Sequence, residues 1–236
     1  LIKQVLEGAA PTASTQLHLD RCLTCRNCET TCPSGVQYGR LVDIGRRVVE
    51  AKVERTMADR GMRAALRNGL TSAAFKPAMK LGQLMRPLLP AALKGKVPPA
   101  ASARAHVWPT RTLDRKVLLL TGCVQPAMAP NINAATARVL DAAVIQTLVA
   151  ERAGCCGAIR EHLADHHGAL DDMRRNIDAW EPIIDRQRIE AIVINASGCS
   201  ATVKDYAHAL RGDKRYAERA ARIAALARDL SELLPG

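Results

Sequence analysis

The pattern of apolar and polar positions changes twice along the chain and predicts three parts. In the first part, residues 1–50, we expect a short helix over 1–7, a loop around Pro11, a group of cysteines and then a second helix. The apolar positions of that second helix follow helical spacing, as one buried face requires: Leu41, Ile44, Val48 and Val49.

The second part, residues 51–114, is basic and rich in alanine, and repeated prolines divide it into short predicted helices. Its stretch 75–93 is apolar with Lys and Arg residues between the apolar ones. We interpret that stretch as a connector that packs on its own protein. The alternative is a segment that docks on a membrane surface or on a partner.

From residue 115 to 236 predicted strands and helices alternate, which favours a Rossmann-like α/β module with a mostly parallel sheet. Short apolar runs predict the strands, over 116–120, 144–149 and 191–195. Amphipathic segments predict the helices, over 131–143, 158–180, 203–210 and 216–230. We expect this part to fold more independently than the first one.

Composition limits the function classes. The formal charge is +11, but the Arg residues are scattered and aromatic residues make up only 3%, so base stacking on nucleic acid is disfavoured. The sequence has no apolar run long enough to span a bilayer and no signal-peptide pattern. We therefore expect a cytoplasmic protein, with peripheral contact to the inner face of the membrane left open, whose eight cysteines bind metal rather than form disulfides.

Four of the cysteines form a single tight run, Cys22-x2-Cys25-x2-Cys28-x3-Cys32, followed by Pro33. This spacing is typical of a [4Fe–4S] cluster, because closely spaced thiolates on one loop can occupy the corners of a cubane. A zinc site more often uses two separated cysteine pairs. In two-cluster ferredoxins the last cysteine of such a run binds the other cluster, so we expect a second motif before Leu1 and two clusters in the full-length protein.

The other four cysteines are far apart in sequence, but each follows a predicted strand: Cys123, Cys155, Cys156 and Cys199. The carboxyl ends of parallel strands meet at one edge of a sheet, so these side chains should converge there. Four such positions favour a cofactor or redox site over buried core thiols. A further iron–sulfur cluster, a zinc ion, or a site that stays empty until a partner binds all remain open.

The spacing Cys123, Cys155-Cys156-Gly157, Cys199 resembles the cysteine-rich "CCG" domain of heterodisulfide reductase, anaerobic glycerol-3-phosphate dehydrogenase, lactate-utilisation and glycolate oxidase iron–sulfur proteins. Segments such as LDRCLTCRNCETTCPSGVQYGRLVDIGR and AGCCGAIREHL look most like the glycolate oxidase iron–sulfur subunit. By this resemblance, the first four cysteines match the second ferredoxin motif and the last four match the first of two CCG repeats. Many members end in Cys-x-x-Cys, whereas Thr202 stands at the last position here. A second CCG repeat is expected after Gly236.

The resemblance implies an electron-transfer subunit of an oxidoreductase without a catalytic residue of its own. A flavin-containing partner subunit would oxidise glycolate to glyoxylate, and a quinone or another membrane acceptor would take the electrons. Lactate or glycerol-3-phosphate dehydrogenase partners stay open, because another chain selects the substrate. Two other classes are a heterodisulfide-reductase-like thiol/disulfide enzyme and a zinc-stapled basic binding module.

A few other residues could have a functional or a structural role. His162 and His166 fall on one face of the predicted helix 158–180 and could bind a metal, but we interpret them as an exposed helix face. We expect Trp108 and Trp180 to be packing anchors. Asp171 and Asp172 are interpreted as a solvated helix turn.

Overall fold

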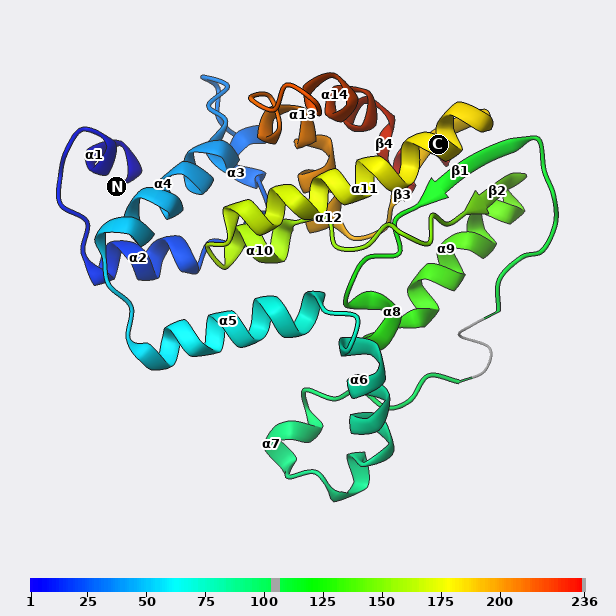
Figure 1. Ribbon diagram of the computed structural model, residues 1–236, viewed down its shortest axis with the longest axis horizontal. Helices are drawn as coiled ribbons and strands as arrows, with labels where there is room; N and C mark the ends of the chain where they lie inside the picture. Colours follow the sequence, from blue (N-terminus) through cyan, green and yellow to red (C-terminus); the bar gives the residue numbers. More distant parts are fainter. Residues whose placement is uncertain (103–106, 235–236) are drawn as a thin grey trace.

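The computed structural model describes residues 1–102 and 107–234, and it confirms the predicted α/β class. Its sheet is entirely parallel, in the order β2–β1–β3–β4, and Val117 of β1 lies beside Thr147 of β2 and Ala191 of β3 (Figure 1). The strands are β1 (Arg115–Leu119), β2 (Ile145–Leu148), β3 (Ile189–Ile194) and β4 (Ala227–Asp229). The helices of this part are α8 (Gln125–Met128), α9 (Pro130–Ala142), α10 (Ala158–His162), α11 (His166–Arg186), α12 (Ser197–Lys204), α13 (Tyr206–Ala209), α14 (Ala217–Leu226) and the 3-10 turn η3 (Leu230–Glu232).

The apolar strands separate two cores, one on each face of the sheet. Successive side chains of a strand point to opposite faces. Val117 of β1 accordingly packs with Leu140 of α9, whereas Leu118 packs with Ile177 and Trp180 of α11. Burial on both faces explains the continuous apolar runs of the two central strands, 117–119 in β1 and 191–194 in β3. It also confirms that Trp180 is a packing anchor, and Trp108 packs against the α9 core.

Three predicted helices have different bounds in the structure. The predicted helix 158–180 is broken at Ala164, whose φ is +61°, and Asp165 then caps α11, which continues to Arg186. The predicted helix 203–210 begins earlier, as α12, and is interrupted at Asp205 before α13. The predicted helix 216–230 ends at Leu226, where the chain forms the edge strand β4, which the sequence analysis missed.

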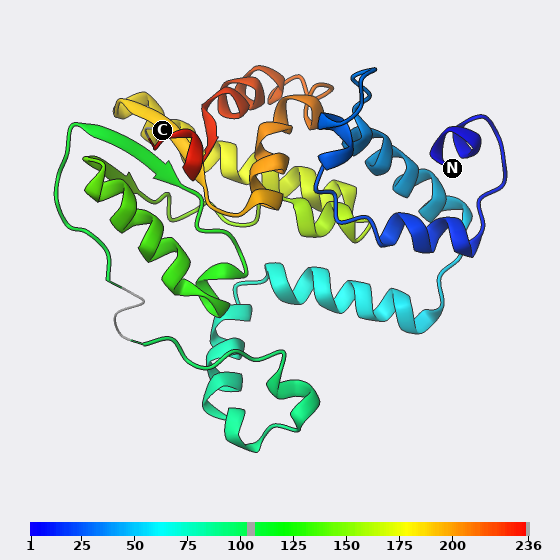
Figure 2. The same ribbon diagram turned by 180° about the vertical axis from the view of Figure 1, so that it is seen from behind.

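The first part of the chain is helical and lies beside the α/β part, at the end of the molecule away from the sheet (Figures 1 and 2). Its elements are α1 (Ile2–Leu6), α2 (Ala13–Asp20), α3 (Asn27–Thr30) and α4 (Tyr38–Lys52). Val5, Leu19 and Val49 form a small core, and Gly45 of α4 gives room for Ile2. Helix α2 replaces part of the expected loop, because the side chain of Thr12 caps it.

Between the two parts, short helices joined by breaks are confirmed. They are α5 (Met57–Thr71), α6 (Phe75–Leu84), the 3-10 turn η1 (Arg86–Leu88) and α7 (Ala91–Lys94). Helix α5 reaches back to the α/β part, where Arg160 donates a hydrogen bond to Thr71 Oγ1 at 3.1 Å. Among the described residues, no helix is both long and apolar enough to cross a bilayer.

Candidate metal centre

The structure brings the last four cysteines together at the carboxyl ends of the strands. Cys123 follows β1, Cys155 and Cys156 follow β2, and Cys199 lies in the first turn of α12, after β3. Cys155 and Cys156 are buried, and Cys123 and Cys199 are half-buried. The sequence argument from strand ends therefore places these residues correctly.

The four thiols interact with one another, and this separates their pKa values. Hydrogen bonds from Cys123 and Cys156, and from the Gly157 N–H at 3.4 Å, lower the pKa of Cys155 to about 3. The same hydrogen bonds hold the proton on the donors, so the pKa of Cys123 and the pKa of Cys156 are raised. A hydrogen bond from Cys156 lowers the pKa of Cys199. The site thus favours a thiolate, the form in which cysteine binds metal.

A buried polar network holds the two adjacent cysteines in place. Asn176 of α11 donates to the Cys155 carbonyl at 2.8 Å and to the Tyr206 hydroxyl at 3.1 Å, and it accepts the Gly154 N–H at 2.8 Å. Tyr206 of α13 in turn donates to the Cys156 carbonyl at 2.9 Å. Both side chains are fully buried. The sequence analysis missed them, although a polar residue on the apolar face formed by Met173, Ile177 and Trp180 was a usable signal.

Gly157 is required by the geometry of the same turn. Its φ is +98°, a region that favours glycine, and a Cβ at this position would lie 2.9 Å from the Ala169 carbonyl oxygen. The close approach of this turn to α11 therefore depends on the absence of a side chain.

The expected solvated turn at Asp171 and Asp172 is confirmed for only one of the two residues. Asp171 is exposed, as predicted, but Asp172 is buried and lies between Arg160, at 3.3 Å, and Arg175, at 2.6 Å. Burial, and then the negative charge at Cys155, raise the pKa of Asp172. The prediction of a solvated turn was wrong for this residue because the helix turns it toward the cysteines.

The first four cysteines lie in the cysteine loop, the segment between α2 and α4 that includes the one-turn helix α3 with Cys28. Cys25 and Cys28 are exposed, and Cys22 and Cys32 are half-buried. Thr24 and Arg26 have φ values of +54° and +57°, so the backbone curls between the cysteines.

Backbone N–H groups that follow Cys32 in the chain donate to its sulfur. Hydrogen bonds from the N–H groups of Val36 and Ser34 lower the pKa of Cys32. Amide hydrogen bonds to sulfur are a feature of iron–sulfur sites.

Both cysteine groups fit iron–sulfur ligation by their donor chemistry. Thiolates are the ligands of such clusters, and each group contains a cysteine whose pKa is lowered by donors around its sulfur. Within residues 1–102 and 107–234, no three Cys, His, Asp or Glu side chains are already arranged to hold a metal ion. Metal ligation by these cysteines therefore stays a prediction.

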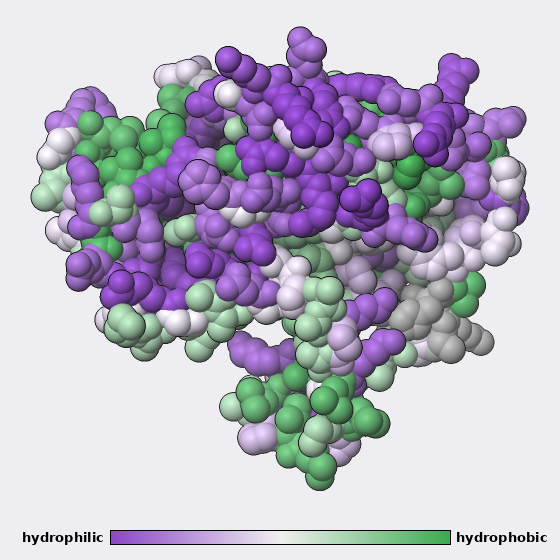
Figure 3. All heavy atoms as spheres, in the orientation of Figure 1, coloured by the Kyte–Doolittle hydropathy of each residue, from purple (hydrophilic) through white to green (hydrophobic). Residues whose placement is uncertain are grey.

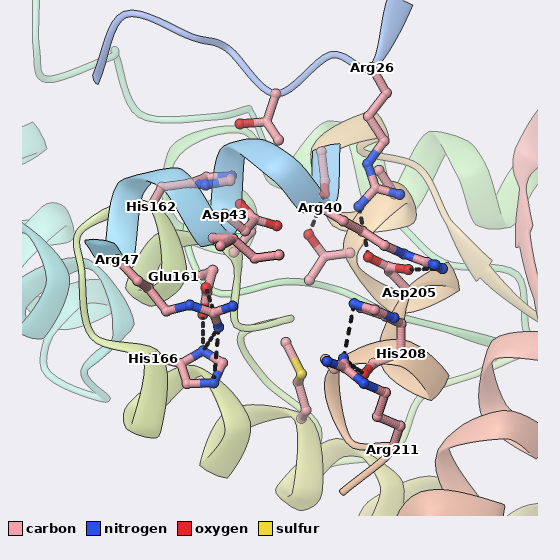
Figure 4. Close-up of a pocket in the computed structure, with 18 of the residues that line it drawn as sticks. Arg26, Arg40, Asp43, Arg47, Glu161, His162, His166, Asp205, His208 and Arg211 are labelled. Atoms are coloured by element: carbon pink, nitrogen blue, oxygen red, sulfur yellow. Dashed lines mark hydrogen bonds and ion pairs between the residues drawn. The ribbon is translucent and has the colours of Figure 1, made fainter. Parts of the chain in front are cut away.

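A pocket of about 380 Å³ lies between the cysteine loop and the α/β part (Figure 4). Leu23 and Thr24 line it from the loop, and Ala158 and Gly198, which adjoin Gly157 and Cys199, line it from the other side. Two ion pairs join its walls: Asp205 binds Arg26 at 3.0 Å and Arg40 at 3.2 Å.

Arg46 of α4 also contacts both the cysteine loop and the α/β part. Its guanidinium donates to the carbonyls of Leu19 and Cys22, at 2.9 and 2.6 Å, and to Thr24 Oγ1 at 3.2 Å. It also donates to Nδ1 of His162 at 3.0 Å, and His162 ends the helix that starts after Gly157. This side chain therefore joins the loop to the α/β part, as the ion pair between Arg26 and Asp205 also does.

The histidine prediction needs a correction. His162 ends α10 and His166 begins α11, so they do not share a helix face. Neither side chain is fully exposed, because His162 contacts Arg46 and His166 contacts Glu161 at 2.7 Å. The sequence pattern could not show the break at Ala164, which separates them.

Two half-buried groups beside this contact give opposite pH responses. Burial, and then Arg46, lower the pKa of His162 from 6.5 to about 4, so the unfolded chain binds the extra proton as the pH falls below 6.5. Burial, and then Glu161, raise the pKa of Asp43 from 3.8 to about 6, so here the folded chain binds it first. Between pH 6.5 and pH 4, acidification should cost stability at His162 and add stability at Asp43, each by about 2 kcal/mol.

Chemical denaturation at pH 7 and pH 4.5 would test this pH dependence. Relative to wild type, H162N should lose less stability on acidification and D43N should lose more. H162N keeps an acceptor for Arg46. If the two variants shifted the pH dependence in the same direction, the assignment of the two pKa shifts would be wrong.

Comparison with known proteins places the sheet-edge cysteines within a known family profile. The family profile of the cysteine-rich (CCG) domain matches residues 117–204, which contain all four cysteines at the sheet edge. The Glycolate oxidase iron-sulfur subunit of Escherichia coli (strain K12) is 50% identical over 99% of this chain and 57% of its own length. The Probable glycolate oxidase iron-sulfur subunit of Bacillus subtilis (strain 168) is 27% identical over 99% of this chain and 58% of its own length.

A more distant similarity covers part of the chain. Lactate utilization protein A of Geobacillus thermodenitrificans (strain NG80-2) is 26% identical over 50% of this chain and 47% of its own length. No solved structure matches the chain. The chain spans somewhat more than half the length of the two glycolate oxidase relatives.

Proposed function

We propose that this chain is an electron-transfer part of a 2-hydroxy-acid-oxidising enzyme. The premise is that it is a relative of the glycolate oxidase iron–sulfur subunits and contains a cysteine-rich CCG domain. In this proposal flavin-containing subunits oxidise glycolate to glyoxylate. The electrons then pass through this chain toward a quinone or another membrane acceptor. An iron–sulfur cluster, when bound, takes up and releases one electron at a time.

The observation that carries the proposal is that residues next to both cysteine groups line one pocket: Leu23 and Thr24 from the first group, and Ala158 and Gly198 from the second. Cys22, Cys25 and Cys28 would hold one [4Fe–4S] cluster, and Cys32 would contribute to a second. The cysteines at the sheet edge would hold a further cluster or zinc. Arg46 would keep the two groups in a fixed relation, because it binds both the Cys22 carbonyl and His162.

The protein around the cysteines would set the properties of bound clusters. Backbone N–H groups that donate to cysteine sulfur stabilise the more negative, reduced state, and burial opposes it. The Gly157 N–H at Cys155 and the N–H groups near Cys32 are such donors. We assign the cluster-binding role to residues 1–50 and 115–236, with 51–114 as the segment between them.

The sequence relatives bear on the choice of substrate only indirectly. Substrate selection belongs to the flavin-containing chain in this proposal, so lactate remains an alternative, which the similarity to Lactate utilization protein A favours distantly. A thiol/disulfide enzyme is a weaker candidate. Many CCG domains end in Cys-x-x-Cys. This chain has Thr202 at the position where the second of these cysteines would follow Cys199.

Metal analysis tests the proposal directly. Anaerobic purification of the full-length protein should yield iron and acid-labile sulfide in near-equal amounts, in multiples of about four per chain. Its visible absorption should bleach when glycolate is added with the flavin-containing subunits. Zinc without sulfide would contradict the proposal and favour a zinc-stapled module. Bleaching by lactate but not glycolate would leave the electron-transfer role and change the substrate.

A further inference from the structure

The unit formed by α6, η1 and α7 projects from the rest of the protein and is apolar at its end (Figure 3). We call its exposed apolar side chains the α6–α7 tip: Leu81, Leu84, Met85, Leu88 and Leu93. Leu84 is 78% exposed and Leu88 is 80% exposed. Single exposed leucines are ordinary on protein surfaces, but a group of them on one projecting unit indicates an interaction surface.

The unit has internal contacts that fix these leucines outward. Arg86 donates from Nε to the Val97 carbonyl at 3.0 Å, which ties the turn after α6 to the segment after α7. The Val97 side chain also packs against Gly82, where it lies 3.6 Å from the position that a Cβ would occupy. Gln83 holds α6 to the α/β part through the Ala127 carbonyl at 3.4 Å. The unit is therefore folded, and the leucines of the tip form its outer surface.

The charge around the tip has one sign. From Arg60 to Leu113 the sequence contains no Asp or Glu. The same unit also carries basic side chains: Lys76, Lys80, Arg86, Lys94 and Lys96. Within the described part of the chain, none of these five forms an ion pair. Leucines beside unpaired Lys and Arg match a surface that is apolar inside and negatively charged outside.

We propose that the α6–α7 tip docks on an anionic lipid bilayer. Leu84 and Leu88 enter the boundary between head groups and acyl chains, and the basic side chains bind the negatively charged head groups. No described helix could span the bilayer, so this contact is with one leaflet. The inference deepens the membrane-acceptor part of the proposed function, because it names the surface that would bring the chain to a membrane.

Flotation with lipid vesicles tests the docking surface. The full-length protein, purified with its cofactors, should float with vesicles that contain phosphatidylglycerol and remain unbound with pure phosphatidylcholine vesicles. Raising the salt concentration should weaken binding, because head-group attraction is screened. The double variant L84E/L88E should bind more than about tenfold more weakly, since it removes the two leucines that would enter the bilayer and adds two charges of the same sign as the head groups. The control V139E changes an exposed apolar residue of α9 and should bind as wild type does.

Each outcome is decisive for the tip, whatever the metal content proves to be. Undiminished binding of L84E/L88E, equal binding to both kinds of vesicle, or no binding to either would overturn the proposal. Loss of self-association or of flavin-subunit binding in L84E/L88E, without lipid binding in wild type, would make the tip a protein contact and also overturn it. Iron and sulfide measured on the same samples report separately on the electron-transfer role.

Discussion

The substitution N176L is expected to destabilise the protein by about 2–4 kcal/mol, because it leaves the Gly154 N–H and the Cys155 carbonyl without their buried partner. Leucine has a similar volume, so the loss comes from hydrogen bonding rather than from a cavity. Asn176 also holds the Tyr206 hydroxyl. We therefore expect the turn that carries the paired cysteines to lose its fixed conformation.

Chemical denaturation and metal analysis together test this expectation. Y206F removes only the hydroxyl that donates to the Cys156 carbonyl and should cost about 1–2 kcal/mol. D171N, on an exposed position of the same helix, should have no measurable effect. A stability of N176L close to that of D171N would show that the network does not support the turn. Stability loss with an unchanged metal content would show that it supports the fold but not the site.

The parts of the fold that the sequence predicts are those with an unambiguous local pattern. The apolar runs of β1 and β3 are buried on both faces, so their identity as parallel strands can be seen from composition alone. The strand β4 is too short to show such a run, and it continues directly from α14. The break at Ala164 depends on a non-glycine residue at positive φ, which no local pattern indicates.

The candidate site divides in the same way. Strand ends placed Cys123, Cys155, Cys156 and Cys199 at one edge, because topology alone brings them there. The residues that hold them, Asn176 and Tyr206, and those that join the two parts, Arg46 and Asp205, could not be predicted in the same way. Their roles depend on contacts between segments far apart in the chain, such as the 3.0 Å contact between Arg26 and Asp205.

The substitution C25S is expected to remove the iron of one cluster, about four atoms per chain, and to lower glycolate-driven electron transfer more than about 100-fold. A serine hydroxyl is a poor substitute for a thiolate, since iron–sulfur clusters are held by Cys thiolates. Cys25 is well suited to this test because its side chain is exposed and makes no hydrogen bond within the described structure. The folded chain should therefore lose no packing when sulfur is replaced by oxygen.

Iron and sulfide analysis of C25S, with the denaturation midpoint of the metal-free protein, separates ligation from folding. Q37S changes an exposed polar residue after the cysteine run and should keep both its metal and its activity. If C25S kept full iron and activity, Cys25 would not be a ligand and the assignment of Cys22, Cys25 and Cys28 to one cluster would fail. If the metal-free C25S were also destabilised, the loop would have a structural role that its exposure does not indicate. Loss of iron at unchanged metal-free stability is the one result that requires ligation, because an exposed thiol without contacts has no other way to affect the protein.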